Sequence, residues 1–168
     1  MISVKLLREV TKLKVGGDTL SLVLLLKKQG ELSEFELAEQ LKEDVNSIRN
    51  KLYRLQQLNL ISYKKSKDAT KGWYVYFWRL APESFRYVHK EMVESELQEE
   101  EAKLIVEKRE RNYRCKNGCV SMSSDEALDA HFSCPQCGEV LTIIDNSKGI
   151  AQLEKRIAKL KKSIDKLS

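Results

Sequence analysis

Residues 33 to 60 read SEFELAEQLKEDVNSIRNKLYRLQQLNL, a stretch with the marks of two short amphipathic helices in succession. Ser33 precedes Glu36 by three residues, which is the pattern of a capping box at a helix start. Asp44 or Asn46 can cap the second helix. The apolar residues of that helix recur at steps of three and four and form one buried stripe: Val45, Ile48, Leu52, Leu55 and Leu58. We therefore predict a helix-turn-helix.

Two β-type runs follow, at residues 60 to 65 and 73 to 80, and the polar loop between them can turn the chain back into a hairpin. Upstream, the most apolar stretch, residues 20 to 26, is far shorter than the roughly 20 apolar residues that a membrane span needs, so it predicts a buried helix. Helices followed by a hairpin are the order of a winged helix. We expect a winged-helix domain of the α+β class over residues 1 to 81.

The second strand of this hairpin is aromatic, with WYVYFW at residues 73 to 78. A strand points successive side chains to opposite faces. Two sets are therefore expected, one with Trp73, Val75 and Phe77 and the other with Tyr74, Tyr76 and Trp78. A two-stranded wing on small helices can bury only one face fully. The other face is expected to be an exposed interaction surface, unless the helix after Pro82 covers it.

Residues 82 to 111 contain no glycine, and the segment from 91 to 110 holds eight glutamates with scattered lysines and arginines. This composition predicts a long solvated helix that separates two domains, in preference to an acidic binding site. Its apolar residues Phe85, Val88, Met92 and Val106 are too sparse to predict a coiled coil.

Two cysteine pairs follow, CKNGC at residues 115 to 119 and CPQCG from residue 134 to 138. Each pair lets a tight loop present two sulfurs to one tetrahedral ion, and Gly118 and Gly138 relieve the sterics where the backbone curls around the metal. Ser123 and Glu126 can cap a short helical turn between the pairs. We predict a two-hairpin zinc ribbon over residues 112 to 147, with one structural zinc ion held by the four thiolates of Cys115, Cys119, Cys134 and Cys137.

The sequence gives less support to other roles for these cysteines. A redox pair at Cys134 and Cys137 needs a thioredoxin-like frame that this segment is too short to supply. A catalytic zinc keeps one position open for water, whereas four cysteines fill the tetrahedron. His131 can replace a cysteine, although a histidine in such a place is more often a surface or packing residue. Two disulfides require an oxidising compartment.

The last segment, residues 148 to 168, carries apolar residues that alternate steps of three and four: Ile150, Leu153, Ile157, Leu160, Ile164 and Leu167. Fewer than three heptads make a weak coiled coil alone, so this seam is expected to dock on another surface or partner and not to form a strong dimer. The lysines flanking the seam read as a solvated face in preference to a nucleic-acid contact.

The net charge of +5 lies wholly in this last segment, which has seven lysines and arginines against Glu154 and Asp165. The remainder is neutral, so the chain is not a general polycation that binds phosphates tightly and without specificity. Its start, MISVKLLREV, has no basic region followed by a long apolar run. We expect an intracellular protein, cytoplasmic or, in a eukaryotic source, nuclear, with reduced cysteines that favour metal over disulfides.

The helix-turn-helix, the run GWYVYFWRL at residues 72 to 80, the charged linker and the two cysteine pairs together resemble the alpha subunit of archaeal transcription factor E, a relative of the large subunit of eukaryotic transcription factor IIE. The resemblance spans nearly the whole chain, and GWYVYFWRL is its most specific piece. One departure is the first cysteine pair, which has three residues between the cysteines where two are expected. That loop is one residue longer, and ligation stays feasible.

The resemblance implies a non-enzymatic initiation factor that joins RNA polymerase at the promoter, with the TATA-binding protein and transcription factor B, and helps the duplex to melt. The winged helix is then expected near the polymerase clamp and the melted DNA, and the ribbon near the stalk. A beta subunit is a further partner that the resemblance allows, and neither a membrane nor a small-molecule substrate is expected. The residues expected to contact DNA or polymerase are Trp73, Tyr74, Tyr76, Phe77, Trp78, Lys64, Lys65, Lys67 and Lys71.

A second hypothesis is a sequence-specific, duplex-binding repressor of the winged-helix class. In that case the outer face of the second helix enters the major groove with Arg49, Asn50, Tyr53 and Arg54. A zinc hydrolase has no cluster of carboxylates and histidines to support it.

The sequence thus predicts a winged helix at 1–81, a charged helical linker at 82–111, a zinc ribbon at 112–147 and a short coiled-coil helix at 148–168.

Overall fold

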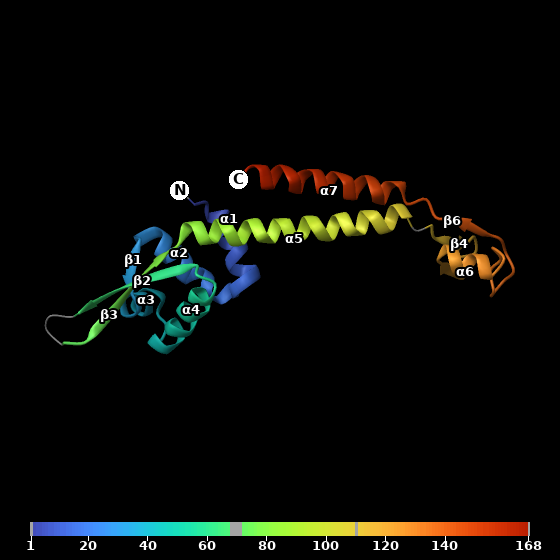
Figure 1. Ribbon diagram of the computed structural model, residues 1–168. Helices are drawn as coiled ribbons and strands as arrows, with labels where there is room; N and C mark the ends of the chain where they lie inside the picture. Colours follow the sequence, from blue (N-terminus) through green and yellow to red (C-terminus); the bar gives the residue numbers. More distant parts are fainter. Residues whose placement is uncertain (1, 68–71, 110, 168) are drawn as a thin grey trace. The chain divides into compact units, whose positions relative to one another are not determined.

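A computed structural model describes residues 2–67, 72–109 and 111–167. The chain divides into two compact units, Met1–Glu91 and Met92–Ser168, and each is described by itself. The described residues of the first unit form, in order, α1 (Val4–Val10), the π-helix η1 (Thr11–Val15), the 3₁₀ helix η2 (Gly17–Thr19), α2 (Leu20–Gln29), β1 (Glu31–Ser33), α3 (Glu34–Leu41), α4 (Val45–Gln57), β2 (Ile61–Lys67), β3 (Tyr74–Leu80) and the first part of α5 (Pro82–Arg109) (Figure 1).

The predicted helix-turn-helix is present as α3 and α4, and its caps are the expected ones. The Ser33 hydroxyl accepts from the amide N–H of Glu36 at 3.2 Å, and the Ser33 amide donates to the Glu36 carboxylate at 2.7 Å. This capping box is the reason that α3 begins where it does. Of the two candidate caps for α4, Asp44 is the one used, because its carboxylate accepts from the Ser47 amide at 2.9 Å.

The buried side of α4 carries the predicted apolar stripe and one charge that the pattern did not reveal. Ile48, Leu52 and Leu55 are fully buried. Lys51, between them, is only 9% exposed, and its Nζ lies 2.6 Å from the Glu43 carboxylate. An ion pair at this depth must be satisfied locally, and the Glu43 carboxylate has its pKa held below the usual range by that lysine.

The sheet of the first unit has three antiparallel strands in the order β1-β3-β2, where the sequence predicted only the hairpin of β2 and β3. The strand missed, β1, has three residues and ends on Ser33, which also caps α3, so it carries almost no pattern of its own. Leu32 and Tyr63 are paired with Trp78 from either side. Leu32, Ile61 and Trp78 are buried, and they anchor the sheet to the helices.

The described residues of the second unit form the rest of α5, β4 (Tyr113–Cys115), β5 (Ser121–Met122), α6 (Ser124–Asp129), β6 (Leu141–Ile143) and α7 (Ser147–Asp165). The three short strands pair in the order β5-β4-β6, and an isolated bridge joins Ser133 to Val140. The predicted capping box of Ser123 and Glu126 begins α6. The buried core is small: Cys115, Ala127, Cys134 and Leu141.

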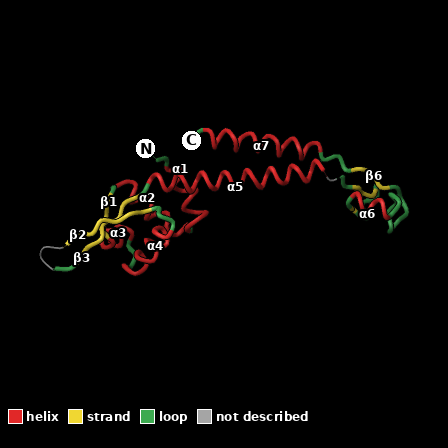
Figure 2. Tube along the Cα trace, in the orientation of Figure 1, coloured by secondary structure: helices red, strands yellow, loops and turns green. Residues whose placement is uncertain are grey.

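Helix α5 has 28 residues, and Figure 2 shows it as one continuous helix. Its second half carries a seam that the linker residues considered from sequence did not reveal. Val93 is buried, Leu97 and Leu104 are half-buried, and the seam position between the two leucines is Glu100. A glutamate in the middle of a short apolar seam conceals the repeat from a search for apolar residues.

This seam faces α7, which runs antiparallel to the second half of α5. Ion pairs join Lys108 to Glu154 at 2.7 Å and Glu101 to Lys161 at 2.8 Å. In the C-terminal seam, Ile157 is buried and the other five residues, four on α7 and Leu167 just beyond it, are half-buried. The C-terminal seam therefore docks on another surface as predicted, and that surface belongs to its own chain. No helix in the described ranges is long and apolar enough to cross a membrane.

Candidate functional site

The four cysteines come together in one cluster. Two hairpin turns hold them: the Gly118 amide donates to the Cys115 carbonyl at 2.9 Å, and the Gly138 amide donates to the Cys134 carbonyl at 2.8 Å. Both glycines have positive φ, 73° and 76°, which a residue with a Cβ rarely adopts. The turns thus aim two thiols each toward the same point.

The geometry suits a single tetrahedral ion. The ligand atoms of Cys115, Cys119, Cys134 and Cys137 all lie within 4.8 Å of one another. Cys115 Sγ and Cys137 Sγ are 3.5 Å apart. Four sulfurs about 2.3 Å from a zinc ion stand about 3.8 Å from each other, so little adjustment is needed. The cluster could hold a metal ion, and its soft, all-sulfur donor set is that of a structural zinc site.

The thiols differ in acidity before any metal binds. The N–H of Glu139, the Cys115 thiol and the Asn117 amide lower the pKa of Cys137 to about 7. The contact with Cys137, followed by desolvation, raises the pKa of Cys119 to about 12, and burial raises the pKa of Cys115. Metal binding releases protons from thiols, so affinity for a metal should rise with pH.

The longer first loop contributes to this cluster. Asn117 lies in it, and its side-chain amide donates to Cys137 Sγ at 3.6 Å. All four cysteines are free thiols, and His131 is exposed and outside the cluster. The ion would therefore have four cysteine ligands, as expected from the sequence.

A second candidate site lies in the first unit, where α4 faces the wing. A groove of about 440 Å³, here called the aromatic groove, is lined by Glu34, Arg49, Tyr53, Gln56, Tyr63, Tyr74, Tyr76 and Trp78. Tyr53, Tyr63 and Tyr74 are each about half exposed, at 53%, 48% and 55%. Tyrosine rings thus stand in solvent on both walls of the groove.

Aromatic contacts pre-arrange the wing side of this groove. The Tyr63 ring lies 5.3 Å from the Tyr76 ring and 5.2 Å from the Trp78 ring. The Lys65 ammonium lies 3.8 Å from the centre of the Tyr74 ring. Trp78 is only 4% exposed, and its Nε1 has no hydrogen-bond partner among the described residues.

The predicted wing residues are thus divided between two faces. Tyr74, Tyr76 and Trp78 line the groove, whereas Phe77 does not and is half-buried. Trp73 is 62% exposed, and Lys64, Lys65 and Lys67 are exposed on β2. Lys71 lies outside the described residues. Tyr53 and Gln56 of α4 also line the groove. Periodicity in the sequence could not predict this grouping, because it brings residues of a helix together with residues of two strands.

The two arginines predicted for major-groove reading are engaged within the protein. The Arg49 guanidinium makes a bidentate contact with the Glu34 carboxylate, at 2.6 and 2.9 Å. Arg54 pairs with Asp18, whose pKa is lowered by that guanidinium. Asn50 and Tyr53 are exposed on the same helix. A helix whose arginines are already held by carboxylates offers less to base edges.

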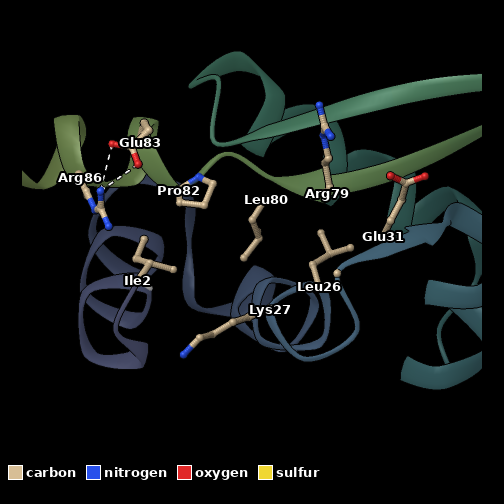
Figure 3. A pocket seen from close by; sticks show the side chains of 10 residues that line it. Ile2, Leu26, Lys27, Glu31, Arg79, Leu80, Pro82, Glu83 and Arg86 are labelled. Atoms are coloured by element: carbon tan, nitrogen blue, oxygen red, sulfur yellow. Dashed lines mark hydrogen bonds and ion pairs between the residues drawn. The ribbon is translucent and has the colours of Figure 1, made fainter.

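Sequence reasoning did not indicate a second hollow of the first unit, of about 630 Å³. Figure 3 shows Ile2, Leu26 and Leu80 in it, with the Arg86 guanidinium bonded to Glu83 at 2.9 Å beside Pro82. Lys27, Glu31 and Arg79 complete the charged part of its lining. These residues come from distant parts of the sequence, so only the tertiary structure brings them together.

Comparisons with known proteins give a consistent result. The sequence matches the family model of the TFIIE alpha subunit over residues 5–109. Transcription factor E of Methanocaldococcus jannaschii is 35% identical over 166 residues, which cover 98% of this chain and 96% of that protein. Transcription factor E of Pyrococcus abyssi is 37% identical over 93% of this chain and 83% of that protein. The protein of the same name from Archaeoglobus fulgidus is 30% identical over 92% of this chain and 89% of its own length.

Proposed function

The chain belongs to the TFIIE alpha subunit family, and from this premise we propose that it is a basal transcription initiation factor that binds RNA polymerase at the promoter and promotes DNA melting. A family of transcription factors is not a class of enzymes, and the protein acts by binding. Its proposed partners are the polymerase, the promoter DNA near the melted region, the TATA-binding protein and transcription factor B. A beta subunit, where one is present, docks on the winged helix or the linker.

The aromatic groove is the observation that carries the DNA part of this proposal. Single strands are bound by aromatic side chains on which bases stack and by nearby cations that contact the backbone. Tyr53, Tyr63 and Tyr74 offer such rings. The exposed Lys65 and Lys67, on the same face of β2 as Tyr63, offer the cations, whereas Lys64 pairs with Phe77 on the opposite face. The bases of a duplex are stacked on one another, so they cannot enter the groove and stack on its rings. The groove therefore favours a strand that has already separated.

Differential binding explains how such contacts promote melting. A ligand shifts an equilibrium only by the difference between its affinities for the two states. The aromatic groove binds separated strands and gains little from the closed duplex. The wing consequently stabilises the open complex, while contacts with the polymerase clamp keep it at the edge of the bubble.

The cysteine ribbon supplies the second anchor. One zinc ion, held by Cys115, Cys119, Cys134 and Cys137, folds the ribbon and takes no part in a reaction, because four thiolates fill its coordination sphere. The folded ribbon docks on the polymerase near the stalk. The ribbon exposes Leu128, Val140 and Ile143, apolar side chains that suit a protein partner.

Permanganate footprinting on a weak promoter tests the melting role. Adding the protein to polymerase, TATA-binding protein and transcription factor B should increase thymine reactivity in the bubble. The double variant Y74A/Y76A should lose most of that increase, while Y87A, a change of an exposed tyrosine on α5, should keep it. Unchanged thymine reactivity with the unmodified protein would count against a role in melting.

Retention on immobilised polymerase tests the docking separately. The whole chain should be retained, and C134S should be retained less because its ribbon is unfolded. Absence of retention for the whole chain would remove the polymerase from the proposal. Selection from a random duplex pool tests the repressor alternative, which predicts enrichment of a defined half-site. The Arg49–Glu34 and Arg54–Asp18 ion pairs argue against that outcome, because they engage the arginines that would read the bases.

A further inference from the structure

The charges of α7 and of its C-cap residue, Lys166, fall into two sets. Members of the first set flank the seam and are paired with α5. Arg156 lies 2.8 Å from the Glu96 carboxylate and 3.8 Å from the Glu100 carboxylate, and Lys161 lies 2.8 Å from Glu101. These contacts neutralise two of the seven cations of the C-terminal segment and hold the helix against its neighbour.

The second set consists of five exposed lysines, here called the lysine stripe: Lys148, Lys155, Lys159, Lys162 and Lys166. None of the five makes an ion pair within the described ranges 2–67, 72–109 and 111–167. The other charged residues of α7 are Glu154, Arg156 and Lys161, which are paired with α5, and the exposed Asp165. The positive charge of the segment therefore remains uncompensated at these five positions.

The spacing of the five lysines places them on one face. They are separated by seven, four, three and four residues. At 100° per residue, all five lie within about 40° of one line along the helix, roughly opposite the apolar seam. Asp165 lies about 100° away from that line. The stripe is about 27 Å long at 1.5 Å per residue, and it faces away from α5 because the seam and its flanking ion pairs face toward α5.

We propose that the lysine stripe binds the phosphate backbone of duplex nucleic acid without reading its sequence. A duplex carries one negative charge per about 1.7 Å of axis, twice the density of a single strand, and an array of five unpaired cations complements it. Helix α7 has no aromatic residue on which an unpaired base could stack, unlike the aromatic groove. Lysine ammonium groups on a stripe without arginine or asparagine contact phosphates and do not discriminate base edges.

This surface is separate from the wing, and its role does not depend on the polymerase. It would add a second, sequence-independent contact with duplex DNA, whereas the aromatic groove takes a separated strand. The two surfaces differ in composition in the way that their ligands differ. Aromatic rings with few cations suit the unstacked bases of a single strand, and cations without aromatic rings suit the phosphates of a duplex.

The test measures how the affinity of the whole chain for a 30-base-pair duplex of arbitrary sequence depends on salt, by fluorescence anisotropy and without polymerase. Each phosphate neutralised contributes about −0.9 to the slope of log K against log salt. The triple variant K155Q/K159Q/K162Q should therefore have a slope shallower by about 2.7. K155R/K159R/K162R should retain the original slope because it retains the charge.

The matched control is K12Q/K14Q/K28Q, which removes the same charge from exposed positions of the first unit. It should change the slope by less than about 1. An equal change of slope in the control and stripe variants would show that the total charge of the protein determines the salt dependence. An unchanged slope in the stripe variant would show that the stripe does not bind the duplex. Tighter binding of a single strand through the stripe, or competition by poly-glutamate as effective as that by DNA, would also overturn the assignment.

Discussion

The winged helix of the first unit buries many large apolar side chains, whereas the ribbon of the second unit has few to bury. Leu22, Leu37, Leu52, Leu60 and Phe85 are all fully buried in the first unit. In the ribbon core, two of the four buried residues are cysteines of the cluster, and Ala127 is one of the others. Small domains seldom gain enough from burial alone and commonly use a metal instead. The comparison predicts that burial of apolar side chains stabilises the first unit and that a bound metal ion stabilises the ribbon.

Removing the metal should have the largest effect and should act on one unit only. Structural zinc contributes about 10–16 kcal/mol of apparent binding free energy to small domains, and we expect that energy to be the folding energy of the ribbon. Chelation of the purified protein should abolish dispersed NMR signals from the ribbon, including those of Tyr113 and Phe132, whose rings lie 5.2 Å apart. The signals of the winged helix should persist.

Re-addition of zinc is the control, and it should restore the ribbon signals. The variant C134S should match the chelated protein, while Q136A, in the same turn, should bind zinc normally. A ribbon that stays folded after chelation would break the comparison, since it would show that its small core suffices.

A cavity in the apolar core should have the next largest effect and the opposite distribution. Leu52→Ala removes a fully buried side chain from α4, which costs about 2–5 kcal/mol. Thermal unfolding followed by circular dichroism should show the first unit melting earlier, and atomic absorption should still find one zinc ion per chain. Tyr53→Ala, an exposed neighbour, should change the melting temperature little. Loss of zinc from L52A would contradict the independence of the two units.

The two capping boxes allow the same change to be made in both units. Ser33→Ala should lower the unfolding free energy of the first unit by about 1 kcal/mol and leave zinc affinity unchanged. Ser123→Ala should remove a similar energy from the ribbon, and because we expect folding and metal binding to be coupled there, zinc affinity should fall about fivefold. Competition with a chromophoric chelator measures the affinity, and Ser21→Ala, at an exposed position of α2, is the control. Equal zinc affinity in S123A and the unmodified protein would contradict the coupling.

Acidification should have the smallest effect, on the pairing of α5 with α7. Glu100 is buried, and Lys103, with Arg156 as a further cation, lowers its pKa from the usual 4.5. A lowered pKa in the folded state stabilises it above the unfolded pKa, and this stabilisation is lost as pH falls through the folded pKa. The unmodified protein should therefore lose more stability than E100Q as pH falls below about 4.5. Thermal unfolding of both proteins at several pH values checks this, and parallel loss would refute a role for Glu100.

Local patterns in the sequence predicted several parts of the structure correctly. The capping boxes at Ser33 and Ser123 were readable because they involve residues three apart in the chain. The cysteine cluster was predictable because ligand spacing and turn glycines are also local. The buried stripe of α4 was found for the same reason, since helical periodicity repeats within two turns. The domain bounds and the DNA and polymerase contacts stay predictions.

Other features were decided by pairs of residues far apart. The strand β1 is defined by β3, more than 40 residues later, and Arg54 is held by Asp18, 36 residues earlier. The seam of α5 was concealed because its middle position is Glu100, whose cations include Arg156 of another helix. Composition gave the C-terminal segment its charge of +5, but not which charges are paired.

The sequence by itself determined where helices begin, which thiols can share a metal and which family the chain resembles, because all of these follow from residues close together in the chain. The tertiary structure decided which aromatic rings form a groove with α4, which arginines are held by carboxylates, and which five lysines of the C-terminal segment make no ion pair with a described residue. The physical reason is that exposure and ion pairing depend on what lies across from a side chain. That neighbour is usually distant in the sequence.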